Sequence, residues 1–156
     1  MLRRKWTLRA HGQQVVFVKK SNEKSSHVLM KGLLWALYLP DYPNLSVEIK
    51  IGDRYKPDVV ALDNDSRPLF WAEAGQVSER KLRSLFKRYP QTHFAIGKWA
   101  QRLDPHIAIV EKALKGLKRT GRIDLISFPN DSVERFVDQN GNVEVMHEDL
   151  DWRQMS

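Results

Sequence analysis

The chain has 156 residues, of which 42% are hydrophobic, so it holds enough apolar material for one domain with its own core. The lack of cysteine excludes disulfides and thiolate metal sites, and the lack of a long apolar run or a secretory signal predicts a soluble, cytoplasmic protein without a membrane partner. The net charge of +7 favours a polyanionic partner.

The first part of the chain predicts an extended segment followed by a buried helix. Residues 1–24 are expected to form a basic arm or strand around the apolar run 15–18. From Ser25 or Ser26, either of which suits an N-cap, strong helix formers continue to Leu39 and stop at Pro40. Because this stretch is almost entirely apolar, we expect the helix to lie in the core.

Three strands are predicted next, over residues 46–51, 57–62 and 68–75. Gly52 and Asp53 supply the first turn, and residues 63–67 supply the second. Two successive hairpins make an antiparallel meander.

The remainder alternates between helices and strands. Amphipathic helices are expected over 79–89 and 104–118, and strands over 92–99 and 122–128. Right-handed crossovers make such strands parallel. The acidic tail, residues 129–156, is expected either to form a hairpin around Gly141 or to lie along the surface. The sequence therefore predicts a single α/β domain, 1–156, with a mixed sheet flanked by helices and a core at about 25–128.

The basic residues are concentrated in one part of the chain. Between Arg80 and Arg122 there are 12 lysines and arginines but only two acids, Asp104 and Glu111. Many of the basic residues share the outer face of the helix at 79–89. A charge cluster of this kind is either a solvated face or a binding surface for a polyanion.

One pair of acids stands out in the second hairpin. If its turn is centred between Asp65 and Ser66, Asp58 and Glu73 are cross-strand neighbours with Cβ atoms roughly 5 Å apart. Two carboxylates at that spacing repel each other unless a cation such as Mg²⁺ or Mn²⁺ lies between them. Alternatively, Asp58 marks the start of a strand and Glu73 is solvated. The apolar residues around Glu73 favour the paired arrangement, because a buried acid needs a partner.

The order of elements, together with the segments 56–58 and 72–76, resembles the PD-(D/E)XK nuclease superfamily and its restriction-endonuclease-like core. Within it, residues 73–83 are similar to the corresponding segment of the YaeQ family, where a glutamate, a glycine two residues on and a Glu-Arg-basic-aliphatic-basic run share the same spacing. The resemblance covers about residues 25–128.

The resemblance implies a Mg²⁺-dependent nuclease in which Asp58 and Glu73 bind the metal. It also implies a lysine two residues after the glutamate, but this chain has Gly75 there. In the YaeQ-like pattern a basic residue of the following helix replaces that lysine, and Lys81 is the candidate. Lys98 and Gln76 are weaker substitutes.

The partner implied by charge and resemblance is DNA or RNA. Six basic residues are predicted to contact it: Arg80, Arg83, Lys87, Arg88, Lys98 and Arg102. Because Gly75 occupies the lysine position, an inactive nucleic-acid-binding module of the same fold is the first alternative. A subunit whose basic face binds an acidic protein is the second. Many nucleases of the superfamily dimerise, which leaves a homodimer open.

Overall fold

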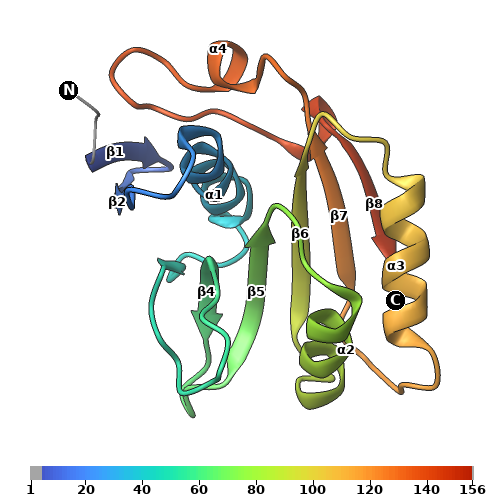
Figure 1. Ribbon diagram of the computed structural model, residues 1–156. Coiled ribbons are helices and arrows are strands. Elements are labelled where there is room, and N and C mark those ends of the chain that lie inside the picture. Colours follow the sequence, from blue (N-terminus) through green and yellow to red (C-terminus); the bar gives the residue numbers. More distant parts are fainter. Residues whose placement is uncertain (1–4, 156) are drawn as a thin grey trace.

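A six-stranded mixed sheet forms the centre of the computed structural model, which describes residues 5–155 (Figure 1). Its strands, in spatial order, are β3 (Ser46–Val47), β4 (Val59–Leu62), β5 (Pro68–Ala74), β6 (His93–Trp99), β7 (Ile123–Phe128) and β8 (Asp151–Met155). β5, β6 and β7 are parallel, and the other pairings are antiparallel. The predicted combination of a meander and parallel strands is confirmed.

Helices cover both faces of the sheet. α1 (Ser25–Tyr38) packs on one face, where Trp35 and Phe70 belong to the larger apolar cluster. α2 (Glu79–Arg88) and α3 (Asp104–Leu114) pack on the other, around Trp71 and Phe94. Because side chains alternate along a strand, Phe70 and Trp71 serve opposite cores. Within residues 5–155, no helix has the length and apolarity needed to cross a bilayer.

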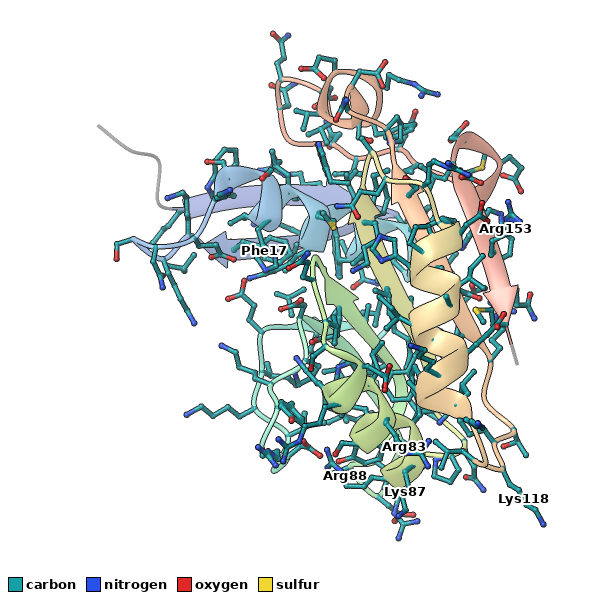
Figure 2. All side chains as sticks on the ribbon, turned by 45° about the vertical axis from the view of Figure 1, so that its right-hand side comes forward. Phe17, Arg83, Lys87, Arg88, Lys118 and Arg153 are labelled. Atoms are coloured by element: carbon teal, nitrogen blue, oxygen red, sulfur yellow. The ribbon has the colours of Figure 1, made fainter. Side chains whose placement is uncertain are left out.

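The segment predicted as an arm or strand forms a hairpin of β1 (Lys5–Ala10) and β2 (Gln13–Val18), and its first four residues lie outside the described residues. The hairpin packs on α1 through Leu8 and Phe17, which are both buried (Figure 2). These two side chains meet the helix at Gly32, where the missing side chain leaves room for them.

The structure departs from the predicted elements at three places. The strand predicted at 46–51 has only two residues, because Glu48 adopts a φ of 54°, which ends the extended backbone. The helix predicted to reach Lys118 ends at Leu114, shortly before Gly116 with its φ of 77°.

The tail is the third departure. Around Gly141 it forms the predicted short hairpin, closed by an antiparallel bridge between Val137 and Val143, but its other elements were not predicted. It contains α4 (Ser132–Phe136) and a short 3-10 helix, η1 (His147–Asp149), and then adds β8 antiparallel to β7. Near Gly141, backbone hydrogen bonds to Arg9 attach the tail to β1.

Candidate active site at the ends of β4 and β5

The hairpin of β4 and β5 has the register that the sequence predicts. Val59 pairs with Ala72 and Val60 with Trp71, so the next pair along is Asp58 and Glu73. The backbone N–H of Asp58 donates to Glu73 Oε2 at 3.3 Å. The N–H of Ala74 donates to Asp58 Oδ2 at 2.8 Å. The two acids therefore lie side by side where the hairpin opens.

Glu73 is enclosed on the face of the sheet that carries α2. It is 5% exposed, and Trp71 Nε1 donates to its Oε2 at 3.3 Å. Lys81 Nζ contacts Glu73 Oε1 as a direct ion pair. Ser78 fixes the start of α2 as the predicted N-cap, because its Oγ accepts from the Lys81 N–H at 3.1 Å. This cap positions Lys81 one turn into the helix, facing the acid pair.

The acid pair is electrostatically strained. Burial raises the pKa of Asp58, an effect opposed by the Ala74 N–H and by nearby cations. Burial also raises the pKa of Glu73, as does the negative charge of Asp58, and Lys81 offsets this only in part. Because the pKa of both acids stays raised despite the nearby lysines, the pair keeps a demand for positive charge.

A divalent cation fits this demand. Among residues 5–155, no group of three or more histidine, aspartate and glutamate side chains is arranged to hold a metal, so a metal here would rest on Asp58 and Glu73. Mg²⁺ suits such a site, because it commonly binds through one or two carboxylates and completes its shell with water and phosphate oxygens.

Gly75, two residues after Glu73, adopts a φ of 91°. A side chain at this left-handed conformation would be strained. The backbone here therefore favours glycine, and basic groups reach the site from neighbouring elements. One is Lys81, and another is Lys98, whose Nζ donates to the Gly75 carbonyl at 2.7 Å.

A buried ion-pair cluster beside Asp58, centred on Lys31, was not predicted. Lys31 on α1 is 5% exposed and forms ion pairs with Glu23 and, at 3.1 Å, with Glu48. Burial lowers the pKa of Lys31, but the hydrogen bond to Glu23 and the charges of Asp58 and Glu48 outweigh it, so the net shift is upward. The signal in the sequence was a lysine in the middle of an otherwise apolar helix.

Next to this cluster lies a hollow of about 450 Å³, which we call the basic groove. Its charged lining residues are the lysines Lys20, Lys24, Lys31 and Lys56 and the acids Glu23, Glu48 and Asp58. Lys20, Lys24 and Lys56 are exposed, so their charges face solvent beside one of the paired acids.

The residues predicted to contact nucleic acid do not form one surface. Arg80 and Lys87 are exposed on α2. Arg83 lies on the same helix, but its guanidinium donates to the carbonyl of Lys115 at 2.8 Å. Arg88 forms an ion pair with Asp53. Figure 2 shows Arg83, Lys87, Arg88 and Lys118 gathered at the end of the molecule where α2 ends.

The remaining two predicted residues lie elsewhere. Lys98 is 5% exposed and lines a cavity on the α2 and α3 side of the sheet. Arg102 is exposed beside the start of α3, where it pairs with Asp104 at 3.2 Å. The basic excess of residues 80–122 is thus divided among a buried position, helix-stabilising contacts and an open surface.

Comparison with known proteins identifies the fold. The sequence matches no family model and no curated protein. The structure resembles the YaeQ protein from Pseudomonas syringae with a TM-score of 0.63 and 18% identity over 86% of this chain and 75% of that one. It resembles the YaeQ protein from Xanthomonas axonopodis pv. citri with a TM-score of 0.60 and 14% identity over 92% and 81% of the two chains. The chain therefore has a YaeQ-like fold.

Proposed function

We propose that the protein is a nuclease of the PD-(D/E)XK type that hydrolyses phosphodiester bonds of DNA or RNA with Mg²⁺ or Mn²⁺. The observation that carries the proposal is the pair of the partly buried Asp58 and the buried Glu73, with Lys81 on Glu73. The order of helix, meander, helix, strand, helix and strand supports a restriction-endonuclease-like core. The basic groove beside Asp58 supports a polyanionic substrate.

The residues have distinct roles in this proposal. A metal held by Asp58 and Glu73 would supply an activated water and neutralise charge on the scissile phosphate. Asp58 is oriented by the Ala74 N–H, which leaves its second oxygen for a ligand. The Lys81 ammonium reaches the same place from α2 and stabilises the negative charge that grows as water adds to phosphorus and the leaving oxygen departs.

The test is cleavage of single-stranded and duplex DNA and RNA with Mg²⁺, with Mn²⁺ and with a chelator. We expect cleavage only with metal, and a loss of at least about a hundredfold in Asp58→Ala and in Lys81→Met, in line with the removal of a group that stabilises a transition state. Lys112→Met is the matched control, because it removes an exposed lysine of α3 that does not line the basic groove. Cleavage that persists in Asp58→Ala would show a contaminant and overturn the proposal.

A specific observation favours a second function, namely nucleic-acid binding without catalysis. Gly75 replaces the expected lysine, and the acid pair is already partly neutralised by Lys81. A binding module predicts salt-sensitive association with DNA or RNA that needs no metal and is unchanged in Asp58→Ala. Binding that requires both the acids and the metal would exclude it.

A further inference from the structure

A cavity of about 330 Å³ lies between the sheet, α2 and α3. Its lining is mainly aliphatic and includes Val77, Leu82, Ile96, Ile109, Val110 and Leu125. Polar groups are few, and Lys98 is the buried one among them. Apolar walls with a small number of placed polar groups are typical of sites for small ligands, whose volumes begin at roughly 300 Å³.

Lys98 is an unusual group to find in such a wall. The pKa of its ammonium is lowered by burial, and within residues 5–155 no carboxylate is paired with it. In that part of the chain its ammonium donates to the carbonyl of Gly75 at 2.7 Å. An ammonium has three N–H donors, so two of them remain for an acceptor in the cavity.

The cavity adjoins the candidate active site. Glu73 is paired in parallel register with Ile96, which lines the cavity, and both side chains lie on the same face of the sheet as Lys98. Gln76 and Ser78, which connect β5 to α2, line it as well. A group bound in the cavity would therefore lie close in space to the paired acids.

We propose that this cavity, which we call the base pocket, holds one unstacked nucleobase of the strand that passes the acid pair, with Lys98 donating to an acceptor on the base. A base offers a flat apolar body and a few hydrogen-bonding groups on its edge, which matches aliphatic walls that also carry the polar residues Gln76, Ser78, Lys98 and His106. A phosphate matches less well, because it carries more negative charge than a single ammonium in an apolar wall can satisfy.

The base pocket rests on the proposed function and refines it toward a substrate class. A base in a duplex is stacked and paired, so it must leave the helix before it can enter a cavity. A single strand requires no such unpairing. The pocket therefore favours single-stranded DNA or RNA, with the phosphates along the basic groove and one base turned toward Lys98.

The experiment uses short single strands of DNA and of RNA with 2-aminopurine at one position at a time, bound to the full chain in Ca²⁺. Binding is followed by fluorescence anisotropy, and the environment of the base by 2-aminopurine emission. We expect a change in emission at one position only, where a base leaves the stack.

Ile109→Trp, which fills the mouth of the pocket, should abolish this change. Ala108→Trp is the control, because Ala108 is exposed on the same helix and does not line the pocket.

Lys98→Met provides the second variant. It removes the buried charge while keeping a long side chain, so we expect it to fold at least as well as the wild type. It should weaken binding of the strand by about tenfold or more, as the loss of a hydrogen bond from a charged donor predicts. Lys112→Met, an exposed lysine on α3, should leave binding unchanged.

The outcomes separate this inference from the proposed function. Strand binding without an emission change at any position, or with the same change in Ile109→Trp, overturns the base pocket even if Mg²⁺ supports cleavage. A position-specific change that Ile109→Trp abolishes supports the pocket even if no strand is cleaved. Absence of any single-strand binding overturns the base pocket, whereas the proposed function is overturned only if duplex DNA and RNA also remain uncleaved with Mg²⁺ and Mn²⁺.

Discussion

At the scale of single residues, the charges of the paired acids oppose folding. Burial raises the pKa of both Asp58 and Glu73, the charge of Asp58 raises the pKa of Glu73 further, and the nearby lysines offset these shifts only in part. Groups placed in this way are common at functional sites, where replacement often stabilises the fold. The stability of variants therefore reports on the site independently of activity.

We predict that Asp58→Asn stabilises the protein when no metal is present, by about 1 kcal/mol. Asparagine keeps an oxygen to accept from the Ala74 N–H and removes the repulsion with Glu73. In Mg²⁺ at a hundred times its Kd, the wild type should gain about 2.7 kcal/mol and the variant much less, so the order of stability reverses.

Urea denaturation with and without Mg²⁺ measures this difference. Asp65→Asn is the control, because Asp65 lies exposed in the turn of the same hairpin, so this variant should match the wild type both with and without Mg²⁺. A wild type that is unaffected by Mg²⁺ up to millimolar concentrations, together with a destabilised Asp58→Asn, would contradict the metal pair.

At the scale of elements, local patterns in the sequence predicted the part of the fold that positions the site. The turn at 63–67 located the hairpin, and the predicted register holds from Val59 to Ala61 although it shifts between Ala61 and Leu62; Ser78 fixed the start of α2. Both depend on contacts a few residues apart. The cluster of Lys31 with Glu23 and Glu48 depends on the packing of α1 against two separate segments, which no local pattern reports.

The missed strand has a similar cause. β8 is mostly exposed at the edge of the sheet, so its residues carry little of the apolar alternation by which strands are recognised. It is held by backbone pairing to β7 instead. The shortened β3 reflects one residue, Glu48, whose left-handed backbone no propensity would assign to glutamate.

A buried polar network joins α1, β6 and β7. Asp124, which is fully buried, accepts from Tyr38 Oη at 2.6 Å and lies 2.7 Å from His93 Nε2. Tyr42 Oη meets the other ring nitrogen of His93 at 2.8 Å. Burial alone would raise the pKa of Asp124, but the hydrogen bonds from His93 and Tyr38 and nearby positive charge hold it below its ordinary value.

This network predicts a loss of stability in acid. A carboxyl whose pKa is lowered by folding contributes stability that is present above its unfolded pKa and is lost as the pH falls through its folded pKa. We expect Asp124→Asn to cost about 3 kcal/mol at pH 7, because it leaves buried polar partners mismatched. The difference in the free energy of unfolding between Asp124→Asn and the wild type should narrow as the pH falls below 3.8, the ordinary pKa of an aspartate.

Urea titrations from neutral to acid pH measure this narrowing. Asp104→Asn, which removes an exposed carboxylate, should run parallel to the wild type across the same range. If the difference in unfolding free energy between Asp124→Asn and the wild type stays constant down to the lowest pH, the charge of Asp124 does not contribute to the stability of the network.

At the scale of the whole molecule, the net charge of +7 separates into regions with different roles. Arg83 and Arg88 are bound to a helix carbonyl and to Asp53, so part of the positive charge stabilises the fold. The basic groove lies beside Asp58. Lys87 and Lys118 lie where α2 ends, at the far end of that helix from its N-cap (Figure 2).

Salt dependence distinguishes these regions. Removing one lysine that binds a phosphate of a single strand lowers the slope of log K against log salt by about 0.7, so replacing both Lys24 and Lys56 by glutamine should lower it by about 1.4. Both residues line the groove that contains Asp58 and project into solvent, so a strand that places its phosphate at the acid pair passes them.

The same replacement at Lys87 and Lys118 should lower the slope less, because a strand crossing the groove need not extend to the end of α2. Equal reductions from both pairs would show instead that the bound strand contacts both the basic groove and the end of α2. A slope that neither pair changes would place the binding surface elsewhere on the molecule.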